Sequence, residues 1–180
     1  MSSGGNIASD VKASNAEIKN NGANLSGYEL EYDPDPWNHK SFVKKNNCYS
    51  YVMNDRRKWP EIPQPGDRYN KNKSPKNTYD NCDDMIKRMQ FDYPRIYQTD
   101  FNTPCKKGFY KSYLTLDPQK DYHFYRQDSN GTFSHKPGKN PVSNKDAAGN
   151  IILNPETASH AYKSYTYSKP CGFLCIPRVF

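Results

Sequence analysis

A cysteine and a histidine in this chain could together carry out nucleophilic chemistry. Cys48 follows Asn46 and Asn47, a residue type that caps helix starts, and His123 lies in an alternating, tyrosine-rich segment typical of a strand. A thiol in the first turn of a helix feels the helix dipole, which lowers the thiol pKa and favours the reactive thiolate. Because an imidazole can accept the thiol proton, the pair predicts the nucleophile and base of a cysteine hydrolase. The alternative is a buried structural cysteine, since free cysteines are common in protein cores.

A second histidine is predicted to lie beside His123. Residues 122–136 indicate a hairpin, because two strand-like segments flank the sequence DSNG, whose Gly131 can adopt a positive φ after a type I turn. Such a turn would pair Tyr125 with His135 and place both histidines on one face, whereas a slip of one residue would reverse this. His123 is then the predicted base and His135 the orienting or substrate-contacting group. The alternative is that His123 is a surface residue of the strand.

The elements that must position these groups predict an α+β domain. Apolar residues at helical spacing indicate one helix from Cys48 and a second from Cys82. Alternation predicts a strand over residues 109–116. Asn154 followed by proline predicts a terminal helix, with His160 off its apolar stripe and in solvent. The expected architecture is therefore a Cys48-bearing helix packed on a small antiparallel sheet.

Composition divides the chain into a polar arm, residues 1–36, and a domain, residues 37–180. The arm is rich in Ser, Gly, Asn and Ala and has too few apolar residues to form a core alone. It holds two basic and six acidic residues, or −4, so the net charge of +7 leaves +11 on the domain. Such an arm could fold back on the domain, or the domain could contact an acidic neighbour. Only 34% of residues are hydrophobic, yet 15 tyrosines and 8 phenylalanines predict a modest, aromatic core.

Five cysteines leave one unpaired if two disulfides form. The pairs Cys82–Cys105 and Cys171–Cys175 would leave Cys48 free, but the spacing does not fix the connectivity. There is no secretory-signal pattern at the N-terminus and no apolar run of roughly 18 to 20 residues, so we expect a soluble, cytosolic chain without a membrane span. Routine disulfides are not expected there unless the protein matures in an oxidising setting. Zinc is the competing use of the cysteines, but CGFLC lacks a second paired motif, so neither a metal nor a cofactor is expected.

Several motifs resemble a little-characterised family of proteins from bacteria and large double-stranded DNA viruses. They are NCYSY around Cys48, the run DYHFYRQD around His123, the segments GTFSHKPG and PVSN, and the closing CGFLC, which together span about residues 46–177. More remotely, the arrangement is similar to the papain-like NlpC/P60 and CHAP amidases. That resemblance implies that Cys48 attacks a peptide or isopeptide carbonyl, His123 shuttles the proton, and His135, or else Asn144, holds the imidazole ring. No glutamine stands a few residues before Cys48, where papain-like enzymes often place an oxyanion donor, and this departure weakens the case for activity more than for fold.

The sequence therefore supports two functions of different classes. The first is a virion structural component, a minor capsid protein of a large DNA virus made in the host cytoplasm, whose arm contacts neighbouring capsid or assembly proteins. The second is an active thiol amidase or peptidase that acts on peptidoglycan or a protein through Cys48 and His123. Nucleic-acid binding is a third possibility that the basic domain invites. It is not favoured, because no RRM, KH, zinc-finger or helix-turn-helix pattern is present.

Overall fold

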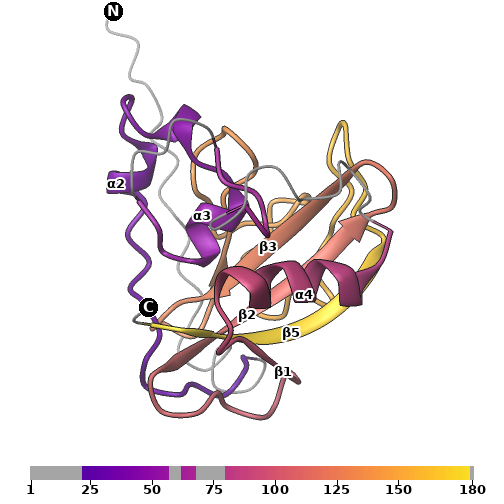
Figure 1. Cartoon of the computed structure of the whole chain (residues 1–180). Helices are drawn as coiled ribbons and strands as arrows, with labels where there is room; N and C mark the ends of the chain where they lie inside the picture. Colours follow the sequence, from indigo (N-terminus) through magenta and orange to yellow (C-terminus); the bar gives the residue numbers. More distant parts are fainter. Residues whose placement is uncertain (1–21, 57–61, 68–79, 179–180) are drawn as a thin grey trace, which may run out of the picture.

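The structure is a computed structural model that describes residues 22–56, 62–67 and 80–178. It is a mostly-β α+β domain in which a five-stranded antiparallel sheet carries a few short helices and two disulfides (Figure 1). The sheet order is β1-β5-β2-β3-β4, with the bounds β1 Tyr97–Thr99, β2 Phe109–Asp117, β3 Asp121–Gln127, β4 Phe133–Ser134 and β5 Lys169–Pro177. The helices are α2 Asp35–Asn38, the 3-10 helix η1 Val43–Lys45, α3 Cys48–Val52 and α4 Cys82–Asp92. Within the described ranges, no helix has the length and apolar character needed to cross a membrane.

Asparagine side chains begin both of the helices that pack on the sheet. The Oδ1 atom of Asn47 accepts a hydrogen bond from the Ser50 amide at 3.0 Å, which confirms the predicted cap before Cys48. Asn81 caps α4 in the same way. The helix α3 is short, because the chain turns at Asn54, whose φ is +50°. Five residues give little of the aligned backbone dipole that a reactive thiolate would need.

The sheet is covered on both faces, and alternation along the strands decides which side chain enters which layer. Figure 1 shows α3 and α4 on one face, called here the helix face. Its core contains Tyr49, Val52, Met85, Ile86, Met89, Tyr110, Leu114, Tyr122, Phe124, Leu174 and Ile176. The opposite face, called here the loop face, has a second core of Ala23, Tyr113, Tyr125, Phe133, Ile152 and Phe173. The predicted aromatic core is therefore present, divided into two layers.

The hairpin of β3 and β4 has the register that the sequence predicts. Arg126 pairs with Ser134, and the Asp128 amide donates to the Thr132 carbonyl at 2.9 Å, so the same register places Tyr125 opposite His135. Gly131 has a φ of +86°, the left-handed conformation that the turn requires. The turn chemistry thus fixes which residues of β3 face the loop layer.

Two disulfides connect segments that are far apart in the chain. Cys82 pairs with Cys171 and Cys105 with Cys175, at sequence separations of 89 and 70 residues. The pairing considered from the sequence is wrong, because β5 runs between β1 and β2 and brings Cys175 beside the segment before β2. Cys48 is the free cysteine, as that pairing also required.

Residues 22–36, the described part of the predicted arm, run along the domain. Ala23 is buried in the loop-face core, and its carbonyl accepts a hydrogen bond from the Gln127 side chain at 2.8 Å. The Leu30 carbonyl accepts another from the Ser129 amide at 2.8 Å. The remainder of the predicted arm lies outside the described residues. The division of the chain at residue 36 stays a prediction.

The loop layer, residues 137–168, consists of turns and isolated bridges. The terminal helix expected after Asn154 is wrong, because Asn154 caps a single turn: its Oδ1 atom accepts from the Glu156 amide and its carbonyl from the Thr157 amide. Buried polar side chains hold this layer in place. The ammonium of the buried Lys136 shares its three N–H donors among four carbonyl oxygens at 2.7 to 3.1 Å, those of Val43, Asn46, Gly138 and Asn140. It thereby joins the entry to α3 to the turn after β4.

Candidate functional site

Cys48 is buried in the core of the helix face. Its side chain is 5% exposed, and Sγ donates a weak hydrogen bond to the Tyr122 carbonyl at 3.8 Å. Burial raises the pKa of the Cys48 thiol far above its ordinary value, and the nearby Asp121 carboxylate raises it further. The lowered pKa expected from the helix dipole is wrong, because loss of solvation outweighs the dipole of a five-residue helix. This thiol is therefore not prepared as a nucleophile.

His123 and His135 lie together on the loop face. The Nε2 atom of His123 is 2.7 Å from Nδ1 of His135, and both side chains are almost fully buried. The structure thus brings the two predicted histidines together, and it places the Cys48 thiol against the backbone of the strand that carries His123. Tyr122 and Phe124, which flank His123 along β3, pack in the same core as Cys48. A catalytic role for Cys48, His123 and His135 stays a prediction. The thiol donates to a backbone carbonyl, and the Nε2 atom of His123 bonds to His135.

The hydrogen bonds fix which nitrogen of each ring carries a proton. The Nε2 atom of His135 is 2.8 Å from the Lys145 carbonyl, which can only accept, so this nitrogen is protonated. In the neutral ring Nδ1 is then an acceptor, and it receives the Nε2 proton of His123. Burial lowers the pKa of His135 to about 4, and it holds the pKa of His123 well below its ordinary value, with His135 as a second cause. Both rings are therefore neutral connectors between β3, β4 and the loop layer near neutral pH.

A tyrosine and a third histidine extend this network. The Nε2 atom of His160 donates to the Pro155 carbonyl at 2.7 Å, so its Nδ1 atom accepts the hydroxyl proton of Tyr125 at 2.8 Å. The Tyr125 oxygen is in turn 3.3 Å from the Tyr162 hydroxyl, which must donate to it. His160, expected in solvent, is instead half-buried, because the segment that carries it is a loop folded over β3 rather than a helix. Tyr125, His160 and Tyr162 are site residues that the sequence reasoning missed.

Two stacked tyrosine rings lie at the outer side of the histidine network. Tyr167 stacks on His123 with ring centroids 5.0 Å apart and donates its hydroxyl proton to Asp121 at 2.8 Å. Tyr165, which is 41% exposed, stacks on Tyr167 with an interplanar angle of 12°. The cluster therefore runs from the buried histidine pair to the surface. One signal in the sequence points to it, the tyrosines and histidines that alternate with core residues on β3 and recur at residues 160–167.

The hydrogen bonds of the histidine rings connect the loop layer to the sheet. Both ring nitrogens of His135 and of His160 are already bonded to groups of the chain. Among the described residues, no group of three histidine, cysteine, aspartate or glutamate side chains is placed to hold a metal ion. Asn144, the second candidate for the orienting residue, is buried, and its carbonyl accepts from the Ile152 amide within the loop layer. The network therefore attaches an irregular layer to the sheet.

Fold and site together define a disulfide-linked, β-rich domain with a buried network of histidine and tyrosine side chains on its loop face. No known family model matches the chain, and no solved structure does. The chain is 32% identical over 147 residues to Insoluble matrix shell protein 1 of Ruditapes philippinarum, which covers 79% of this chain and 87% of that protein. The chain belongs to the family of this shell matrix protein.

The family membership corrects the resemblance drawn from the sequence. The assignment to a cysteine-hydrolase-related family of bacteria and DNA viruses is wrong, and so are the expected capsid function and virion location, because the relative is a shell matrix protein. The motifs around His123 and His135 determine the hairpin register and the polar network. Contacts of the arm with other assembly proteins, and a peptide substrate, stay predictions.

Proposed function

We propose that this chain is a secreted structural protein of an insoluble, shell-type extracellular matrix. The observation that carries the proposal is the relation to Insoluble matrix shell protein 1, which spans 87% of that protein and 79% of this chain. A match of this extent includes both layers of the domain rather than one motif. The matrix location in the relative's name is therefore extended to this chain as a whole.

The covalent structure supports an extracellular location. Disulfides persist in oxidising environments and are uncommon in the cytosol. The two bonds connect the start of α4 and the segment before β2 to the strand β5, so they fix both ends of the sheet region. By the loop-closure argument, cross-links at separations of 89 and 70 residues each stabilise the fold by up to about 4.5 kcal/mol. A matrix protein that must stay folded outside the cell benefits from this stabilisation.

The loop layer gives a second line of support. Its backbone groups bond to the buried side chains of His135 and Lys136 and to the half-buried Asp146, an arrangement that fixes a rigid surface without regular secondary structure. Such a surface suits a building block better than a site that must open for a substrate. The finer expectation of an NlpC/P60-like core stays a prediction beside this proposal.

The experiment is to locate the protein in the source organism. Mineralised tissue is decalcified, the soluble and insoluble fractions are separated, and both are analysed by mass spectrometry together with a soft-tissue extract. We expect peptides of this chain in the insoluble fraction, with Cys82, Cys105, Cys171 and Cys175 oxidised and Cys48 free. Detection confined to soft tissue, with all five thiols reduced, would overturn the proposal.

A further inference from the structure

Many carboxylates of this protein are used within the molecule. Glu29 accepts hydrogen bonds from the amides of Ser26 and Gly27, and Asp146 accepts from three amides of the loop layer. Asp100 accepts from two amides and a hydroxyl of its own turn. Others bond to side chains of the core: Asp92 to Tyr49, Asp121 to Tyr167 and Asp128 to Arg126. These groups stabilise turns and buried polar atoms, so they are poorly placed to bind calcium from solution.

Several cations, in contrast, are directed to solvent. Lys106, Lys107 and Arg178 are exposed, and neither of the close ion pairs Arg88–Asp84 and Arg126–Asp128 involves them. The net charge of the whole chain is +7. A partner that meets this surface is therefore expected to be negatively charged.

These three cations and the exposed Arg95 lie at one place, around a pair of aromatic rings. We call this region the basic aromatic surface, and its residues are Arg95, Tyr97, Lys106, Lys107, Phe109 and Arg178. The rings of Tyr97 and Phe109 are 5.3 Å apart at an interplanar angle of 64°. The Lys106 ammonium lies 5.1 Å from the Tyr97 centroid, and the Arg95 guanidinium 5.8 Å from that of Phe109. Arg178 is placed beside them, because its amide donates to the Gly108 carbonyl at 2.9 Å.

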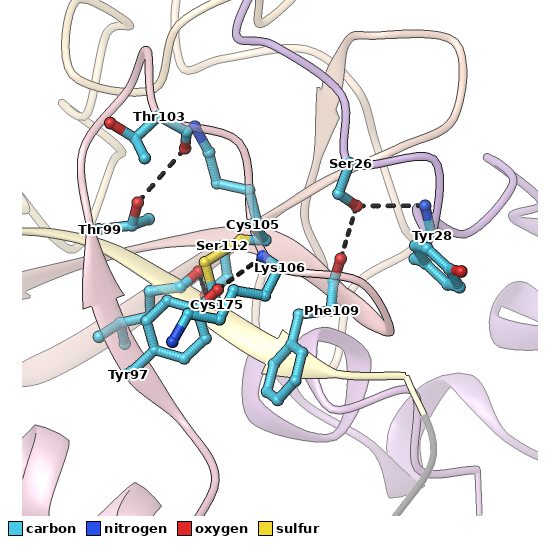
Figure 2. Close-up of a disulfide and its surroundings, with 12 residues drawn as sticks. Ser26, Tyr28, Tyr97, Thr99, Thr103, Cys105, Lys106, Phe109, Ser112 and Cys175 are labelled. Atoms are coloured by element: carbon cyan, nitrogen blue, oxygen red, sulfur yellow. Dashed lines mark hydrogen bonds between the residues drawn. A yellow bond between two sulfur atoms is a disulfide. The ribbon is translucent and has the colours of Figure 1, made fainter.

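The surface is preorganised by covalent and hydrogen bonds. Figure 2 shows the Cys105–Cys175 disulfide beside Tyr97, Lys106 and Phe109. The disulfide attaches the residue before Lys106 to β5, and the Lys106 amide donates to the Tyr97 hydroxyl oxygen at 2.7 Å. This bond leaves the hydroxyl proton of Tyr97 available to an acceptor. A ligand that binds here therefore orders few groups on binding.

We propose that the basic aromatic surface binds an anionic polysaccharide, one that carries sulfate or carboxylate groups on its sugar rings. The lysine and arginine side chains supply the positive charge for the anionic groups, and the two rings supply apolar faces for the C–H faces of the sugars. Two rings at 64° cannot both stack on successive parallel bases, which disfavours single-stranded nucleic acid at this surface. The evidence for the surface does not depend on the proposed function. The choice of an extracellular polymer as its ligand rests on that proposed function.

The test measures binding of the full, disulfide-intact chain to immobilised heparin and alginate, at low salt and at about 0.15 M salt. Neutral dextran, phosphatidylserine vesicles and single-stranded DNA are the comparison ligands. The double variant Lys106→Ala/Lys107→Ala is compared with Lys120→Ala/Lys163→Ala, which removes the same charge from exposed loops elsewhere. Tyr97→Leu tests the ring, with the near-ultraviolet spectrum as a check of folding.

We expect the Lys106/Lys107 variant to bind the sulfated or the carboxylated polymer about three- to tenfold more weakly at low salt, and the control variant to match the parent. Tyr97→Leu should weaken binding at both salt concentrations, because a ring contact is less screened. Equal losses in the two double variants would overturn the assignment of the surface. Stronger binding to DNA or to vesicles than to either polymer would overturn the class of ligand. Neither result depends on where the protein is found. Polysaccharide binding can therefore fail while the matrix location holds, and the matrix location can fail while the binding holds.

Discussion

Acidification is expected to unfold this domain through its buried histidines. His135 has a pKa of about 4 in the fold, lowered by burial against the opposing effect of the Lys145 carbonyl, and His123 also titrates well below its ordinary range. In the unfolded chain both return to about 6.5. Since the unfolded state then binds more protons between these values, the stability is fully present above pH 6.5 and is lost as the pH falls toward 4.

The magnitude follows from the two pKa values. Between pH 7.5 and 5.0 a histidine that titrates near 4 in the fold and near 6.5 when unfolded loses about 2 kcal/mol of stability. Protonation of His123 acts in the same direction, because its folded pKa is also lowered. The loss expected from His135 alone is a large share of the about 5 to 15 kcal/mol by which domains are stable.

The assay is urea unfolding followed by tryptophan fluorescence at pH 7.5, 6.5, 5.8 and 5.0, which stays above the range of ordinary carboxylates. His135→Gln keeps a donor for the Lys145 carbonyl but cannot be protonated, and it should reduce the loss of stability between pH 7.5 and 5.0 by about 2 kcal/mol while lowering the stability at pH 7.5. His39→Gln, at an exposed turn, is the control and should leave the dependence unchanged. A parent protein whose unfolding free energy is the same at pH 7.5 and 5.0 would refute the reasoning.

Three further predictions concern the polar and covalent connections. Lys136→Met should destabilise the fold by about 3 to 5 kcal/mol in urea unfolding, because four carbonyls lose one buried donor; a loss below about 1 kcal/mol would show that water replaces the ammonium. Cys82→Ser/Cys171→Ser should lower the unfolding free energy by about 2 to 4 kcal/mol under oxidising conditions, and the difference from the parent should vanish in reductant. In the native protein Cys48 should react with iodoacetamide far more slowly than a free thiol peptide at pH 7.5, whereas rapid labelling would contradict its burial and raised pKa.

The parts of the fold that local chemistry determines could be predicted from the sequence. The turn ending at Gly131 sets the register of β3 and β4, so the meeting of His123 and His135 followed from residues close together in the chain. The apolar stripe of α4 indicated its buried face for the same reason. In both cases the spacing within one element carries the information.

The parts that depend on how elements pack could not be read in this way. The spacing around Cys48 shows that the helix buries one stripe, but not which face of β3 that stripe meets. The disulfide partners follow from the position of β5 between β1 and β2, a long-range result of the sheet order. The sequence at Asn154 predicts a helix because a helix cap and a single isolated turn begin with the same residue types. Only the packing of this segment over β3 distinguishes the turn from a helix.

The irregular loop layer explains why polar side chains are buried at and beside its junction with the sheet. Backbone groups outside helices and strands still need partners when they are buried, and here the side chains of His135, Lys136 and Asp146 supply them. An apolar side chain at any of these positions would leave carbonyls or amides without a partner, so the polar residues are required by the irregular backbone itself. Because two of the buried polar groups are histidines, the fold depends on neutral imidazoles. The two disulfides add a dependence on an oxidising solvent. Near-neutral, oxidising surroundings satisfy both conditions, and these are the surroundings of an extracellular matrix.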